Sequence, residues 1–168
     1  MKELTWDAAE KILARNHLGR LACYSPSRDT SYIVPMSYAF HDGSIYLGML
    51  PGQKLNFLRE HPQGVCFEVD EITNDSTWIT VIATGVFVEL QGPERSQQEA
   101  AAIERALHGP LRAIFYENSK RIGAAGLHIG ALRISALTAR QDSWSWETDF
   151  PESLRRLDIL ASDGGDPG

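Results

Sequence analysis

The sequence predicts a mainly β protein, a small antiparallel barrel with helices packed around it. Short runs rich in β-branched and aromatic residues alternate with turn residues along most of the chain. One run, at residues 78–90, has 13 residues with Gly85 in its interior, which is typical of the long coiled strands that close barrels. Helical character is confined to three segments, at residues 5–16, 52–61 and 93–107. This order of helices and strands predicts the decorated barrel.

The first element is expected to be a short helix that begins after Thr5. The Thr5 hydroxyl can cap the helix, and apolar residues such as Ala9 and Leu13 follow at helical spacing. Asn16 and Gly19 are residues that commonly end helices. The helix is therefore expected to end near residue 16.

Three strands are expected next, at residues 18–24, 32–40 and 44–47. The second contains Pro35, which cannot donate a ladder hydrogen bond, so its pairing should be broken there by an edge or a bulge. The Asp42-Gly43 pair between the second and third strands is typical of a tight hairpin turn.

The second half of the chain continues the same alternation. Its elements are expected to be a helix at 52–61, strands at 65–69 and 78–90, a helix at 93–107 and a last strand at 127–139. Gly85 predicts a bend or bulge in the longest strand. Residues 1–160 are expected to form a single domain, and the Gly- and Asp-rich tail at 161–168 is expected to be mobile.

Composition and charge exclude several classes of protein. The chain has 168 residues and a mass of 18.7 kDa, which suffices for one domain with a sizeable core. Its net charge is −6, whereas a nucleic-acid binder normally carries a basic surplus. Its apolar runs are far shorter than the ~20 residues that a membrane span needs, and the acidic N-terminus is unlike a signal peptide. The two cysteines, Cys23 and Cys66, lack metal-ligand spacing, so we expect buried, inert thiols in a reducing, cytoplasmic compartment.

One segment, Ser44–Leu55, has a pattern that can bind phosphate. The common nucleophile, zinc and nucleotide motifs are absent from the chain. Within this segment a strand ends, turns through two glycines and a proline, and enters a helix near Gly52. The first amides of that helix would have no intrahelical acceptor, and Lys54 adds a full positive charge beside them. An ordinary strand-to-helix connection with a solvated lysine would have the same sequence.

An ordered series of motifs resembles the FMN-binding split barrels related to pyridoxamine 5′-phosphate oxidase, especially their nitroimidazole-resistance-like branch. The resemblance runs from Leu18 to Leu90, with a looser continuation through residues 132–134. Its anchors are Gly19–Ala22, Tyr32–Phe40, Gly43–Tyr46, Pro51–Leu55, His61-Pro62, Val65–Val69 and Trp78–Gly85.

The resemblance implies a homodimer of six-stranded split barrels, with FMN in each of two clefts between the protomers. It places one strand along the isoalloxazine and ribityl chain, largely through its backbone, at Val34, Pro35, Met36, Ser37 and Tyr38. It places Leu47 and Gly48 beside the ribityl phosphate, Gln53 and Lys54 on the phosphate, and Thr80 on a strand that faces the flavin. No metal ligand and no catalytic side chain follow from it.

The activity that the resemblance implies is that of an FMN-dependent oxidoreductase, which passes electrons from a reduced nicotinamide to a small molecule. The alternative is a non-catalytic module that binds flavin or haem in the same cleft, and a barrel without ligand is a third possibility. Gly48 stands where many nitroimidazole-resistance-like relatives have a histidine, so chemistry that depends on that histidine is not expected.

The end of the last strand differs from the true oxidases. Residues 143–147 do not match their substrate-binding tail, so pyridoxamine phosphate is not the expected substrate. Trp144 and Trp146 share one face of an extended chain. They could cover a flavin or a flat substrate, or they could pack at the dimer interface or the barrel end.

Overall fold

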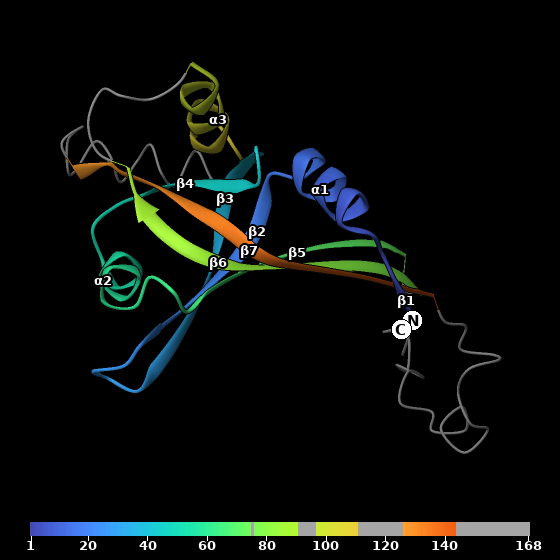
Figure 1. The fold of residues 1–168 in the computed structure, drawn as a ribbon, viewed down its shortest axis with the longest axis horizontal. Helices are drawn as coiled ribbons and strands as arrows, with labels where there is room; N and C mark the ends of the chain where they lie inside the picture. Colours follow the sequence, from blue (N-terminus) through green and yellow to red (C-terminus); the bar gives the residue numbers. More distant parts are fainter. Residues whose placement is uncertain (75, 91–96, 111–125, 144–168) are drawn as a thin grey trace, which may run out of the picture.

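Six strands in the described part of the chain pair in a ring (Figure 1). The computed structural model describes residues 1–74, 76–90, 97–110 and 126–143. The strands of the ring are β2 (Leu18–Ser25), β3 (Thr30–His41), β4 (Ser44–Met49), β5 (Val65–Asn74), β6 (Thr77–Glu89) and β7 (His128–Ser143). Their antiparallel order is β7-β4-β3-β2-β5-β6, and β6 pairs with β7 to close the ring. This confirms the barrel that the sequence predicts.

The closing pair of strands, β6 and β7, contains the irregularity predicted at Gly85. Thr84 is opposite Ala136, but Gly85 is opposite Ile134, so one residue of β7 is left out of the pairing. A Cβ atom on Gly85 would lie 1.9 Å from the carbonyl oxygen of Arg133. The backbones therefore meet too closely at this bulge for any residue with a side chain.

Three helices cover the barrel in the described chain (Figure 1). They are α1 (Trp6–Arg15), α2 (Gln53–Glu60) and α3 (Gln97–Leu107). α1 packs against β3 and β7, α2 against β2, and α3 against β3 and β4. The Thr5 hydroxyl accepts a hydrogen bond from the amide of Ala8 at 3.3 Å, so the predicted cap of the first helix is present. The predicted start of the third helix at residue 93 lies outside the described residues.

The core has two parts, one inside the barrel and one beneath α3. The inner part contains the large buried side chains of the strands together with those of α1 and α2, among them Leu13, Leu21, Tyr38, Leu55, Phe57 and Phe67. The second part joins α3 to the outer faces of β3, β4 and β7 through Ala39, Tyr46, Ala102, Ile103 and Ile129. Both surfaces of the β3–β4 region are therefore packed, which fixes the position of these two strands.

Two strands, β5 and β7, run well past their predicted C-terminal ends, and one strand was not predicted. β5 continues from residue 69 to Asn74 through mostly polar residues, because β6 pairs with it there, with one register shift between Ile72 and Asn74. β7 likewise continues from residue 139 to Ser143 opposite β6. The short β1 (Lys2–Glu3) pairs with β7 at residues 140–141. The tail at 161–168 lies outside the described residues.

Candidate functional site

β3 leaves its neighbour β4 part-way along its length, and this separation opens the barrel. β3 pairs with β2 from Thr30 to Ser37, but with β4 only from Tyr38 to His41. In the described chain, the β4-facing edge of residues 30–37 thus has no strand partner. The amide of Tyr38 donates to the carbonyl of His17, on the β2 side, at 3.1 Å. Because strand residues alternate, the nitrogen of Pro35 faces the open edge, where no ladder bond is lost.

The open edge decides whether Pro35 marks a strand edge or a bulge, the two alternatives that the sequence left. The pairing of β2 with β3 runs without a shift across Arg20 and Pro35. The edge is therefore confirmed, and there is no bulge in the β2–β3 pair.

The predicted site residues of β3 and β4 lie around this opening, but most of their side chains face the core. Met36, Tyr38 and Leu47 are buried, and the Tyr38 hydroxyl donates to the carbonyl of Leu13 at 2.8 Å. Gly48 follows Leu47, just beyond the last β3–β4 pair, and is also buried. This part of the opening offers a ligand backbone groups in place of functional side chains.

The start of α2 follows directly from the end of β4 through residues 50–52. The first bond of the helix runs from the amide of Asn56 to the carbonyl of Gly52 at 3.1 Å, and no side chain caps the helix at Gly52. The amides of Gln53, Lys54 and Leu55 precede that bond, so they have no acceptor within the helix. A Cβ at Gly52 would meet nothing within 4 Å, so the approach to these amides is open.

Lys54 is a half-buried cation that forms no hydrogen bond or ion pair with any described residue. Burial lowers its pKa, and the nearby thiol of Cys23 opposes this effect. In contrast, Arg15, Arg20 and Arg59 each pair with a carboxylate. A cation that has lost part of its hydration without gaining a counter-ion is electrostatically suited to bind an anion.

The two cysteines have no reactive environment. Burial raises the pKa of both Cys23 and Cys66, so both thiols stay protonated near neutral pH. Cys23 is fully buried as predicted, but Cys66 is only half-buried, on the outer face of β5. The described residues contain no group of histidine, cysteine and carboxylate side chains that could hold a metal ion.

Thr80 lies apart from Lys54, on the outer face of β6. It lines a cavity of about 420 Å³ together with Arg20, Glu68, Asp70 and Trp78. A second cavity of about 420 Å³ shares Arg20 and Asp70 with the first and extends past His17 to Pro35. Thr80 and the open edge of β3 therefore line two cavities that share Arg20. The structure does not bring Thr80 to the start of α2.

Arg20 lines both cavities and is held by two carboxylates. Its guanidinium pairs with Glu68 at 3.1 Å and with Asp70. The hydrogen bond to Asp70, followed by the charge of Asp70, raises the pKa of Arg20. Arg20 belongs to the Gly19–Ala22 motif of the family resemblance, but it was not among the predicted site residues.

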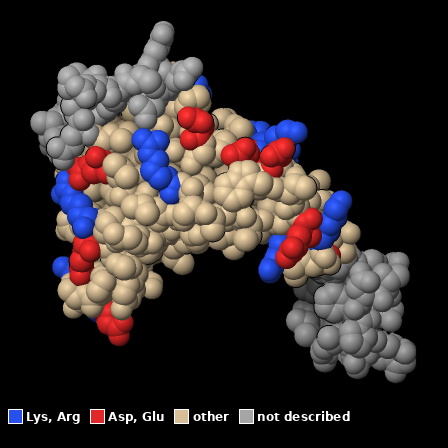
Figure 2. Space-filling view, viewed as in Figure 1, with Lys and Arg blue, Asp and Glu red and all other residues tan. Residues whose placement is uncertain are grey.

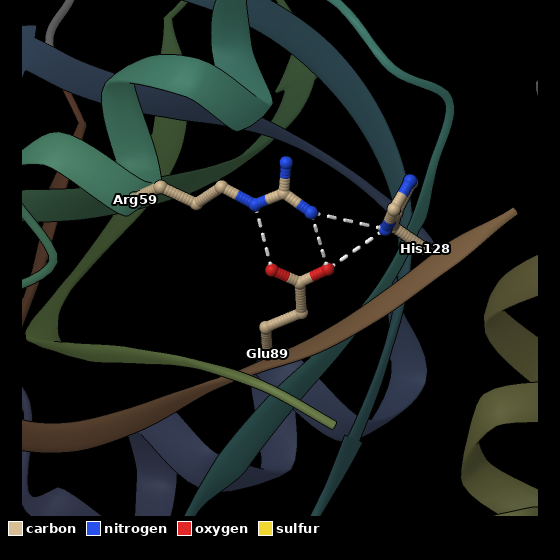
Figure 3. Close-up of polar contacts among 3 residues, drawn as sticks. All are labelled: Arg59, Glu89 and His128. Atoms are coloured by element: carbon tan, nitrogen blue, oxygen red, sulfur yellow. Dashed lines mark hydrogen bonds and ion pairs between the residues drawn. The ribbon is translucent and has the colours of Figure 1, made fainter. Parts of the chain in front are cut away.

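A cluster that the sequence analysis missed joins the last turn of α2 to β6 and β7 (Figure 3). Arg59 donates through Nε and Nη2 to the two carboxylate oxygens of Glu89, at 2.8 and 2.7 Å. His128 Nδ1 lies 2.7 Å from Oε1 of Glu89, at which distance an Nδ1–H donates to the carboxylate. These hydrogen bonds, above all those from Arg59, lower the pKa of Glu89 to about 2.

The lowered pKa of Glu89 is expected to make the stability of the protein depend on pH in acid. An Asp or Glu with a depressed folded-state pKa stabilises the fold above its unfolded pKa, and this contribution is lost as the pH falls. Replacing Glu89 by glutamine should therefore cost about 1 kcal/mol near pH 7, since Arg59 is partly exposed, and almost nothing near pH 2. Chemical denaturation of both proteins across this range measures the difference. An equal difference at both pH values would contradict it, and Glu104→Gln on the exposed side of α3 is the control.

A family model described as pyridoxamine 5′-phosphate oxidase matches residues 5–141 of the chain. The chain belongs to this family. An uncharacterised protein of Rhizobium meliloti (strain 1021) is 29% identical over 99 residues, which are 59% of this chain. The match spans 64% of that relative's own length.

Three solved structures have the same fold as this member of the pyridoxamine 5′-phosphate oxidase family. A FAD-binding protein from Mesorhizobium loti has a TM-score of 0.67 and 24% identity, covering 85% of this chain and 97% of its own. A haem-binding protein from Mycobacterium smegmatis has a TM-score of 0.61 and 19% identity, covering 83% and 57%. A Bacteroides thetaiotaomicron protein described as a candidate 5-nitroimidazole antibiotic resistance protein has a TM-score of 0.60 and 12% identity, covering 83% and 86%. The resemblance seen in the sequence, and the split-barrel fold that it implies, are confirmed.

No helix within the described ranges is long and apolar enough to cross a membrane. Trp144 and Trp146 lie outside those ranges, so both interpretations of this pair stay predictions.

Proposed function

We propose that the protein is a flavoprotein that binds FMN at the opening between β3 and β4, with the phosphate at the start of α2. The observation that carries the proposal is the half-buried Lys54 without a counter-ion among the described residues. A phosphate there would accept hydrogen bonds from the amides of Gln53 and Lys54 and would neutralise the ammonium group. The FAD-binding protein from Mesorhizobium loti, which has the same fold, supports a flavin.

The open edge of β3 suits the flat remainder of this cofactor. Its residues from Val34 to Met36 have one row of backbone groups that no strand in the described chain uses. The isoalloxazine carries polar atoms along its pyrimidine edge, which these groups can bind. Pro35 removes one donor from the row and presents a flat apolar ring in its place.

The activity that follows is an oxidoreductase, which takes electrons from a reduced nicotinamide and passes them to a small molecule. The flavin supplies the hydride chemistry, and the protein supplies binding, orientation and exclusion of water. Met36, Tyr38 and Leu47 hold the open edge rigid from the core side. Both free thiols, Cys23 and Cys66, are consistent with a reducing, cytoplasmic location.

A second copy of the chain is proposed to complete the site as a homodimer. The outer face of β6 exposes Ile82, Val86 and Val88, each to 40%. Figure 2 shows that the central band of this face of the molecule, over β6 and β7, carries few charged residues. An exposed apolar row of this kind is typical of a self-association surface. Thr80 belongs to the same outer row of β6, so a dimer could bring Thr80 of one protomer to the flavin of the other.

A haem-binding module is the second candidate function. The haem-binding protein from Mycobacterium smegmatis has the same fold. In this chain, His17 is exposed and lines the cavity beside Pro35, where its imidazole could bind haem iron. The absorption spectrum of the purified protein separates the two candidates, because a flavin and a haem have different bands.

Sedimentation of the apo-protein mixed with FMN tests the proposed function and the dimer together. The flavin absorbance is expected to sediment with the protein at twice the mass of an 18.7 kDa chain. Added reduced nicotinamide should then bleach the bound flavin if the protein is an oxidoreductase. Flavin that stays at the meniscus would contradict the FMN site, and flavin that sediments with a monomer would contradict the dimer alone.

A further inference from the structure

The cluster of Arg59, Glu89 and His128, called here the Glu89 clamp, connects three elements at one point (Figure 3). Arg59 is in the last turn of α2, Glu89 is the last residue of β6, and His128 is the first residue of β7. The Glu89 side chain is only 18% exposed and accepts from both partners. Charge-assisted bonds of this bidentate kind fix geometry as well as supplying energy.

The segment that carries Lys54 is attached at both of its ends beside the start of β7. The Glu89 clamp is the second of these attachments. At one end, Met49 of β4 is the pairing partner of His128. At the other end, Arg59 is held by Glu89, and its Nη2 lies 3.3 Å from His128 Nδ1. The connection at 50–52 and nearly all of α2 lie between these two fixed points.

The first turn of α2 depends on these fixed points for its orientation. Gly52 provides no side-chain cap, so the helix has no such anchor at its start. Buried Leu55, Phe57 and Leu58 set how deeply α2 packs on the barrel. Two polar contacts at the last turn add to this apolar face in fixing the rotation of the helix about its axis. Arg59 donates to Glu89, and Glu60 accepts from the amide of Ser27 at 2.7 Å.

A short helix moves as a rigid body, so a rotation at its last turn also rotates its first turn. Lys54 and Arg59 are separated by about 7.5 Å along the axis of this eight-residue helix. If the Glu89 clamp opens, one of the two polar contacts that limit rotation of the helix about its axis is lost, while the apolar contacts remain. Lys54 and the amides beside it would then sample several directions in place of one.

We propose that Glu89 is a positioning residue, which holds the start of α2 in the orientation that binds the cofactor phosphate. The inference rests on the proposed function for its ligand, but the orientation itself can be measured without one. Glu89 would contribute to affinity by reducing the conformational freedom that binding must otherwise remove.

The test compares Glu89→Gln with Glu71→Gln, a control of matched chemistry. Glu71 accepts from Arg15, which is in the last turn of α1, and from Asn16, so it forms the same kind of clamp at another helix. Affinities for FMN and for riboflavin, which lacks the phosphate, are measured by flavin fluorescence. We expect Glu89→Gln to weaken FMN about 3- to 10-fold and to leave riboflavin unchanged, with no change in either for Glu71→Gln.

Hydrogen exchange of the ligand-free proteins gives the second readout. The amides of Gln53, Lys54 and Leu55 should exchange faster in Glu89→Gln than in the native protein or in Glu71→Gln. Arg59→Lys, which retains one bond to Glu89, should give an intermediate rate. Unchanged exchange at these amides, or an equal loss of FMN and riboflavin affinity, would overturn the inference. A native protein that binds no FMN would instead overturn the proposed function, while the exchange comparison would still decide the role of Glu89.

Discussion

Replacing Lys54 by alanine is expected to weaken FMN binding by about 1–3 kcal/mol, which is about 5- to 150-fold in Kd. The reason is that Lys54 is half-buried and forms no ion pair within the described chain, so its charge is available to the phosphate. The lost affinity should come only from the contact between Lys54 and the phosphate. Titrations with FMN and with riboflavin should therefore diverge in the variant, because only FMN has lost a contact.

Two controls make this result specific to the site. Lys11→Ala removes an exposed lysine on α1 and should leave both affinities unchanged. Lys54→Arg keeps the positive charge and should retain most of the FMN affinity. If Lys54→Ala binds FMN as tightly as the native protein, the phosphate does not lie at the start of α2. If FMN and riboflavin are weakened equally, Lys54 contributes to the fold of the opening and not to phosphate binding.

Features that depend on a few neighbouring residues could be predicted from the sequence. Pro35 indicated an edge or a bulge because a missing amide hydrogen has the same consequence in any sheet, and the register of β3 shows that it is the edge. Asp42 and Gly43 both have positive φ, as a tight hairpin turn requires. The Ser44–Leu55 segment does form a strand, a turn and a helix in that order.

Features that depend on distant residues could not be predicted in this way. The sequence does not say whether Lys54 finds a carboxylate in the folded chain, which is what distinguishes an anion site from a surface lysine. Nor does it bring together Arg59, Glu89 and His128, which are separated by 30 and 39 positions and meet only because β6 and β7 close the barrel. Thr80 illustrates the same limit, since its distance from the start of α2 follows from the topology of the sheet and not from local pattern.

The closing seam between β6 and β7 is also where a small substitution is expected to have the largest effect on stability. Gly85→Ala should destabilise the protein by about 3 kcal/mol, at the upper end of the range for overpacked sites. The added Cβ would lie 1.9 Å from the carbonyl oxygen and 2.8 Å from the carbonyl carbon of Arg133, and 3.0 Å from Cα of Ile134. All three atoms belong to the backbone, so no side-chain rotation can relieve the contact. The two strands must separate where the barrel closes.

Thr84→Ala is the matched control, because Thr84 is the exposed neighbour of Gly85 in β6 and its β-carbon is already accommodated. It should change the free energy of unfolding by no more than about 0.5 kcal/mol. Urea denaturation of the two variants measures the difference, and a lower midpoint at an unchanged slope for Gly85→Ala would attribute the loss to the folded state. Equal midpoints for the two variants would mean that the bulge can shift to another residue of β7. In that case Gly85 would not be what holds the closing seam in register.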